Sequence, residues 1–172
     1  MAGNGDTSVT VGLNWLPPIL MLSGTWEEIV TGLYAIFEKD FKQVKPKFQH
    51  YMVGWDQRVL PGLCYEEGFW HLISRDERST GERIPDFRRA ERLPWCAPII
   101  TNSHDSAIKV WDYLESKGQL RTYVWLEDGD YCIILEKLKR PVQPAAMLIT
   151  AFHVDGPSRK RNLRNKLAKR ET

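Results

Sequence analysis

The sequence predicts an α+β fold, with N-terminal helices followed by an antiparallel β-meander sheet and a basic C-terminal helix. Three features support this order: apolar residues at helical spacing near the start, alternating segments joined by short turns later, and a lysine- and arginine-rich end. A chain of 172 residues is long enough for one domain. We expect a single domain over residues 1–157, with residues 1–11 as a flexible arm and residues 158–172 as a basic tail.

The first helix is predicted to begin after Ser23-Gly24-Thr25, a typical start signal, with Glu27 and Glu28 placed favourably for the helix dipole. It should end before Pro46, because proline disfavours helix at the preceding residue. Large apolar residues recur at three- and four-residue intervals and define one buried face: Trp26, Ile29, Val30, Leu33, Phe37 and Phe41.

The middle of the chain has weaker signals. Residues 47–68 have no clean period, and the apolar run 69–74 fits either a strand or a helical turn. A polar loop over 75–82 precedes a short helix predicted over 84–93, which Pro94 limits. Residues 108–113 are expected to form an edge strand.

The meander is predicted from three further segments. Residues 121–127 alternate, with Thr122, Val124 and Leu126 on one face and Arg121, Tyr123 and Trp125 on the other. Asp128-Gly129 predicts a hairpin to a strand over 131–138, and 146–154 supplies the third strand. In that strand, plain alternation puts Thr150 and His153 on opposite faces unless a bulge intervenes. The tail carries Leu163 and Leu167 four residues apart, as in a helix with a thin apolar stripe.

Composition narrows the class of protein. No apolar run approaches the roughly 18–20 residues of a membrane span, and no signal peptide is recognisable, so we expect a soluble cytoplasmic protein without membrane association. Cys64, Cys96 and Cys132 are widely separated and predict neither disulfides nor a zinc site. No cofactor-binding motif or convergent carboxylate cluster appears, so we expect neither cofactor nor metal.

Charge is concentrated at one end of the chain. Residues 158–172 hold seven basic residues and one acidic residue, although the whole chain has a net charge of only +2. Such asymmetry favours an acidic partner, most commonly a nucleic acid. The candidate contacts are Arg159, Lys160, Arg161 and Arg164 in the tail, with Arg121, Tyr123 and Trp125 as a strand face suited to bases and phosphates.

Histidine and arginine are the residues that metal-free RNA cleavage would use. An imidazole can move protons near neutral pH, and a guanidinium matches phosphate oxygens. His71 lies in Phe69-Trp70-His71-Leu72-Ile73, just before an arginine-rich stretch that includes Arg92. The structural alternative for His71 is a histidine that packs among aromatic residues. The alternative for the arginine-rich stretch is a surface helix whose arginines form salt bridges.

The segments 69–73, 75–95, 121–137 and 148–152 resemble, in order, the small toxin-type ribonuclease superfamily that unites barnase, EndoU, RelE and the tRNA-cleaving colicins, particularly its phage-encoded branches. The resemblance implies a catalytic histidine at His71, an arginine at Arg92 and a late-strand hydroxyl at Thr150, with Arg121 and Tyr123 as supporting contacts. It offers no counterpart for the second histidine that some branches use.

Three hypotheses follow. The first is a metal-independent endoribonuclease that cuts RNA by attack of the 2′-hydroxyl. The second is a non-catalytic nucleic-acid-binding domain that uses the same basic tail and aromatic face. The third is a protein-interaction module of phage or mobile-element origin, with an inhibitor or another protein as its partner.

Overall fold

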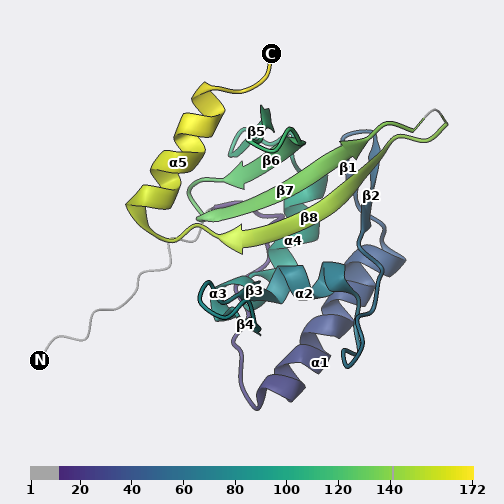
Figure 1. Ribbon diagram of the computed structural model, residues 1–172. Helices are drawn as coiled ribbons and strands as arrows, with labels where there is room; N and C mark the ends of the chain where they lie inside the picture. The colour runs from purple at the N-terminus through teal and green to yellow at the C-terminus, as the bar shows by residue number, and fades with distance from the viewer. Residues whose placement is uncertain (1–11, 141) are drawn as a thin grey trace, which may run out of the picture.

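The protein is an α+β fold in which a six-stranded mixed sheet is covered by helices on both faces (Figure 1). The computed structural model describes residues 12–140 and 142–172; the predicted arm 1–11 lies outside them. No helix in this described part of the chain is long and apolar enough to cross a membrane.

The first predicted helix is confirmed. Helix α1 (Trp26–Phe37) begins with a capping box between Thr25 and Glu28, and its buried face includes Val30, Leu33 and Phe37. A π-helical segment, η1 (Glu38–Gln43), continues it and buries Phe41. The helical run therefore ends before Pro46, as the sequence indicates.

The middle segment forms several short elements. Strands β1 (Lys47–Phe48) and β2 (Tyr51–Trp55) precede helix α2 (Glu67–Ile73) and the small hairpin β3 (Ser74–Asp76)–β4 (Arg83–Pro85). The helix predicted over 84–93 is wrong in extent, because α3 covers only Phe87–Ala90. Asp86 caps its first turn by accepting from the backbone of Arg89, and residues before Asp86 pair in the β-hairpin instead. The helical segments η2 (Leu93–Trp95) and α4 (Cys96–Thr101) follow.

The meander is confirmed and is longer than predicted. Strands β5 (Ile108–Leu114), β6 (Leu120–Leu126), β7 (Tyr131–Leu138) and β8 (Ala145–His153) pair antiparallel in sequence order. A purely antiparallel sheet is not what forms, however: β8 also pairs in parallel with β2, giving the order β1-β2-β8-β7-β6-β5. Helix α5 (Gly156–Ala168) forms the predicted basic helix and packs on the sheet.

Two apolar clusters lie on opposite faces of the sheet. The larger one joins α1, α2 and α4 to Val124, Leu126 and Leu148. The smaller one gathers Trp111 and the neighbouring aromatic residues of β6 beneath Leu163 of α5. The predicted alternation of β6 is therefore confirmed, but both of its faces are buried.

Strand β8 contains a bulge that matters for the site. Ile134 of β7 pairs with Thr150, whereas the next residue, Leu135, pairs with Leu148. Ile149 is thus the extra residue, and beyond it the faces of β8 are exchanged relative to simple alternation. Pairing with β2 also stops at Leu148, so the edge of β8 from Ile149 onward is open to α2 and α3, which lie beside it (Figure 1).

Candidate active site

Helix α2 brings His71 and Glu67 onto one side, because residues four apart in an α-helix share a face. Glu67 is buried and accepts two hydrogen bonds from Arg83 of β4, from Nη1 at 2.8 Å and from Nη2 at 2.9 Å. Its Oε2 lies 3.7 Å from Nε2 of His71. A histidine, a carboxylate and an arginine therefore form one connected group, in which Glu67 is the shared member.

The His71 ring is only partly covered, with 41% of its side chain exposed. Burial lowers the pKa of His71 below its usual value of 6.5, and the positive charge of Arg83 lowers it further, while Glu67 opposes both effects. The ring is consequently neutral at pH 7. A neutral, accessible imidazole beside a carboxylate can accept a proton, and the carboxylate stabilises the cation that results.

Arg89 joins the other end of α2 to strand β8. Its Nη1 donates to the backbone carbonyl of His71 at 3.0 Å and to Oγ1 of Thr150 at 3.2 Å. The Thr150 hydroxyl in turn donates to the same carbonyl at 3.2 Å. The guanidinium also lies 5.9 Å from the ring centre of Phe152. These contacts fix α2 against the open edge of β8, and we call the set His71, Arg89 and Thr150 the α2–β8 junction.

Positive charge gathers at this junction. Asp86 is the nearest carboxylate to Arg89, at 3.3 Å from Nε, and also lies 3.8 Å from Nε of Arg75. Burial lowers the pKa of Arg89, and the neighbouring cations Arg159 and Arg75 lower it further. Two guanidinium groups, from β3 and α3, thus share the single carboxylate of Asp86, and Arg159 of α5 adds a third positive charge near Arg89. This excess of positive over negative charge favours binding of an anion at the surface.

The structure does not bring Arg92 to this junction. Arg92 is buried, its guanidinium contacts Glu91 and the carbonyl of Arg88, and it lies 5.4 Å from the ring of Trp95. The arginine that contacts the His71 carbonyl and Thr150 is Arg89, three residues earlier. The sequence places both arginines in the same short segment, and only the end of α3 at Ala90 separates their surroundings.

The predicted aromatic face of β6 is not available for stacking. Tyr123 is 3% exposed and Trp125 is fully buried, because Trp111 and α5 cover them. Arg121 forms an ion pair with Glu136 of the neighbouring strand. Tyr123 and Trp125 therefore cannot stack on bases in this structure, because alternation shows which residues share a face but not what covers that face. A role of Arg121 in nucleic-acid binding stays a prediction.

The basic tail is partly used for folding. Lys160 pairs with Asp130 at 2.7 Å, and Arg164 pairs with Glu127 at 2.6 Å. Arg159 and Arg161 are exposed and have no ion-pair partner among residues 12–140 and 142–172. Of the four predicted tail contacts, these two are exposed without an ion pair in the described residues, whereas Arg164 is paired but 60% exposed.

Glu67, Arg83 and Arg89 are not among the site residues predicted from the sequence. The four-residue spacing of Glu67 and His71 indicates a contact only if the segment is helical. The apolar run 69–74 fits a strand as well as a helical turn, so the sequence alone did not establish this contact. In the described part of the chain, His, Cys, Asp and Glu side chains form no group of three suited to a metal ion.

No family model, curated protein or solved structure matches this chain. The α2–β8 junction and its surroundings therefore provide the observations that bear on function.

Proposed function

We propose that this protein is a ribonuclease that cleaves RNA by attack of the substrate's own 2′-hydroxyl, with His71 as the general base. The observation that carries this proposal is helix α2, which holds the partly exposed His71 ring beside Glu67 and Arg83 and whose His71 carbonyl accepts a hydrogen bond from Arg89 at the α2–β8 junction. Proton transfer and stabilisation of a phosphorane-like charge are the two requirements of this reaction.

In the proposed reaction, Nε2 of His71 takes the proton of the 2′-hydroxyl, and Glu67 at 3.7 Å stabilises the imidazolium. The 2′-oxygen forms a bond to phosphorus, and the bond from phosphorus to the 5′-oxygen breaks. The leaving 5′-oxygen takes a proton from water, His71 gives its proton to the hydroxide that results, and the product keeps a 2′,3′-cyclic phosphate. Arg75 and Arg89 neutralise charge on the phosphate oxygens, while Thr150 keeps Arg89 in place.

The first test is incubation of purified protein with total RNA in EDTA, followed by analysis of the new ends. Cleavage with 2′,3′-cyclic ends is expected, and His71→Ala should lower its rate about 10²- to 10⁴-fold, as for loss of a general base. His104→Ala is the matched control, because His104 is an exposed histidine far from the junction in sequence. An unchanged rate in folded His71→Ala would overturn the assignment of the base.

Arg89→Met tests the arginine independently. It removes the guanidinium while keeping an unbranched side chain, and cleavage should fall steeply because the phosphate loses a cation and Thr150 loses the donor that connects it to α3. Circular dichroism checks that the variant is folded. Wild-type activity in Arg89→Met would show that phosphate is held elsewhere.

A second candidate function is RNA binding without cleavage, which the exposed Arg159 and Arg161 favour. Intact RNA that is retarded on a gel, less so as salt rises, would support this function, because each phosphate contact releases counterions. Arg159→Ala with Arg161→Ala should then weaken binding and flatten its salt dependence. If RNA is neither cut nor retained at low salt, both functions fail and an interaction with another protein becomes the hypothesis to test.

A further inference from the structure

A groove of about 260 Å³ crosses strands β2 and β8 at the end of the sheet where β8 begins, and we call it the β2–β8 groove. Met52 of β2 pairs with Ala145 of β8, and Gly54 pairs with Met147. Paired residues of neighbouring strands share a face of the sheet, and these four line the groove. The alternate residues of both strands belong to the larger apolar cluster. The groove therefore lies on the opposite face, the one that α5 covers elsewhere.

Helix α5 leaves this part of the face open. Among the described residues, the smaller apolar cluster beneath α5 includes side chains from β5, β6, β7 and the end of β8, but none from β1 or β2. Figure 1 shows α5 over the part of the sheet away from β1 and β2. Gly54 has no atom within 4 Å of the position that a Cβ would take, so the floor of the groove is open at this residue.

Flexible apolar side chains surround this open floor. Met52 and Met147 lie beside Gly54, and Leu138 of β7 also lines the groove. Methionine adapts its shape to a partner surface more readily than branched side chains do. The volume is below the range of about 300–1,000 Å³ that small-molecule sites occupy. The groove is therefore of a size for single side chains of another protein.

The rim of the groove is positively charged. Arg140 lines it, and Lys47 of β1 lies on the same face because Lys47 pairs with Met52. Both side chains are exposed, and within the described part of the chain neither forms an ion pair. Glu136 of β7 lies opposite Met147 and is already paired with Arg121. The two cations are thus free to meet an anionic partner.

This charge comes from two distant parts of the chain. Residues 41–55 and residues 137–154 contain three basic residues each and no acidic residue. Neither segment stands out alone, but the parallel pairing of β2 with β8 brings them side by side. The sheet thus creates a basic surface that is separate from the basic tail.

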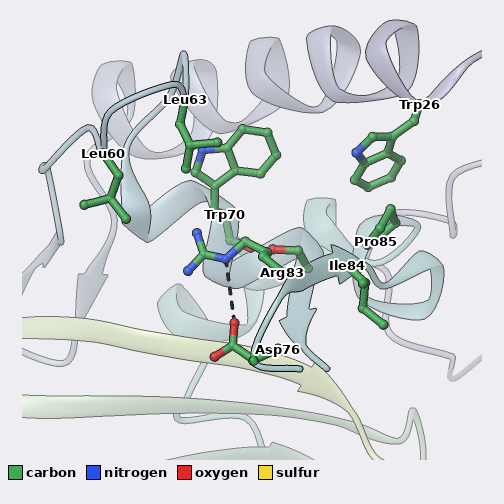
Figure 2. Close-up of a pocket in the computed structure, with 10 residues that line it drawn as sticks. Trp26, Leu60, Leu63, Trp70, Asp76, Arg83, Ile84 and Pro85 are labelled. Carbon is green, nitrogen blue, oxygen red and sulfur yellow. Dashed lines mark hydrogen bonds and ion pairs between the residues drawn. The ribbon is translucent and has the colours of Figure 1, made fainter. Parts of the chain in front are cut away.

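The larger cavity of the molecule is different in this respect. It has a volume of about 430 Å³ and lies beside α2, with Trp26, Trp70 and Pro85 among its walls (Figure 2). Arg83 and Asp76 both line it, with Nε and Oδ1 3.9 Å apart. That cavity carries both signs of charge and indicates neither for a ligand. The β2–β8 groove carries cations beside an apolar floor, which specifies its partner more closely.

We propose that the β2–β8 groove binds an acidic segment of a partner protein. An apolar side chain of that segment occupies the floor over Gly54, and its flanking carboxylates meet Lys47 and Arg140. This interaction goes beyond the proposed ribonuclease activity, because the groove shares no residue with the α2–β8 junction.

Nucleic acid matches the charge of the groove but not its lining. Proteins that hold single strands without sequence preference stack the bases on exposed aromatic rings. The aromatic residue that lines the groove is Trp55, whose indole packs edge-to-face on Phe37 and Phe41 in the core. The methionines and the glycine of the floor suit an aliphatic side chain better.

Binding can be followed by NMR of protein labelled with ¹³C in its methionine methyl groups. The chain has four methionines, so the signals are few and can be assigned with Met52→Leu and Met147→Leu. The probe is the synthetic peptide acetyl-EEDLDEE-amide. It should shift the signals of Met52 and Met147 and leave that of Met21, which is 97% exposed, unmoved. The same peptide with serine in place of leucine should bind about tenfold more weakly, because the groove then buries no apolar side chain.

Variants of the protein separate the charge from the floor. Lys47→Ala with Arg140→Ala should weaken the leucine peptide about tenfold. Lys117→Ala with Arg161→Ala is the matched control, because it removes two exposed cations outside the groove and should leave the affinity unchanged. Gly54→Val fills the floor with a residue that strands favour, so the fold is kept. It should reduce the affinity for the leucine peptide to that for the serine peptide.

Four results would overturn the proposal. The first is that the leucine peptide does not shift Met52 and Met147, and the second is that the serine peptide binds equally well. The third is unchanged affinity in Gly54→Val, which would show contact through charge alone. The fourth is that a short 2′-O-methyl RNA, which has no free 2′-hydroxyl to attack phosphorus, shifts the two signals and displaces the peptide. That result would assign the groove to nucleic acid.

The two proposals fail in different ways. Peptide binding at Met52 and Met147 in a protein that leaves RNA intact would keep the groove and remove the catalysis. RNA cleavage by a protein that does not bind the peptide would keep the catalysis and remove the groove.

Discussion

The two faces of the sheet are closed by different forces. The face that carries α1, α2 and α4 is sealed by a continuous apolar core, in which Phe37, Phe41 and Phe69 are fully buried. The opposite face is covered by α5, whose buried residue is Leu163. Ion pairs supply much of the remaining contact, from Lys160, Arg164 and Lys166 to carboxylates of the sheet and its loops.

This difference changes how the basic end of the chain is understood. A lysine or arginine that pairs with a carboxylate of its own fold contributes little to the field that a distant ligand experiences. Three cations of α5 are used in this way, and they hold the helix over Tyr123 and Trp125. The four-residue spacing of Leu163 and Leu167 predicted the helix correctly, but exposure decides which of its cations can meet a partner.

The largest expected effect comes from breaking the apolar face. Phe69→Ala removes a fully buried ring from α2 and should lower the free energy of unfolding by about 3–5 kcal/mol. Urea denaturation followed by circular dichroism measures it. Phe87→Ala is the matched control, because that ring is 54% exposed and its loss should cost much less. Equal losses in the two variants would contradict the assigned core.

Leu163→Ala should have the next largest effect, and it should be local. Loss of this buried side chain weakens docking of α5 by about 2–3 kcal/mol. Hydrogen exchange is expected to speed up in the amides of α5 while those of α2 keep their protection. Faster exchange across both helices would show that the two faces unfold together.

Lys166→Met should loosen α5 by a smaller amount, about 1–2 kcal/mol. The Lys166 Nζ donates to Glu115 at 2.8 and 2.9 Å and to the Tyr123 hydroxyl at 2.7 Å. Methionine keeps the chain length but leaves Glu115 without this donor. Tryptophan fluorescence should shift to the red as α5 opens, and Lys169→Met, an exposed cation at the end of the helix, should leave it unchanged.

The smallest effect is a difference in acid sensitivity between the two faces. Because His71 has a lowered pKa in the folded protein, the unfolded chain binds this proton more readily. The contribution of His71 to the free energy of unfolding is therefore complete above pH 6.5 and decreases as pH falls below that value. The pKa values of Glu115 and Glu127 under α5 are also lowered, by Lys166 and by Lys109 with Arg164, despite the opposing effect of burial. The two glutamates therefore contribute fully to the free energy of unfolding above about pH 4.5. This contribution is lost only as pH falls through their lowered pKa values in the folded protein.

Resonance shifts of His71 and hydrogen exchange in α5, both followed from pH 8 to pH 3, check this order. The His71 ring should titrate below pH 6.5, while α5 should keep its protection until pH falls below about 4.5. Opening of α5 at pH 6 would contradict the role of the two glutamates.

Elements with a strong local signal could be predicted from the sequence. The spacing of Val30, Leu33 and Phe37 predicts α1, and Asp128-Gly129 predicts the hairpin between β6 and β7, because both depend on neighbouring residues. The pairing of β2 with β8 could not be predicted, since it joins Met52 to Ala145 and no local pattern encodes such a contact.

The candidate site was predictable only in part for the same reason. His71 and Thr150 were identified as candidates, and the structure joins them through the His71 carbonyl. The link between them, Arg89, depends on the bulge at Ile149 and on where α3 ends. Neither feature has a sequence signal strong enough to choose Arg89 over Arg92.

The parallel pairing of β2 with β8 also has a consequence for the order of folding. β8 lies between β2 and β7, so the six strands cannot become one sheet until residues 145–153 have been synthesised and have inserted between two strands made earlier. Contacts between such distant segments form slowly, because a long loop must close first. Until then β2 and β7 each present an unpaired edge, and Thr150 has not reached Arg89. Any activity of the α2–β8 junction is therefore acquired late, with the closing of the sheet.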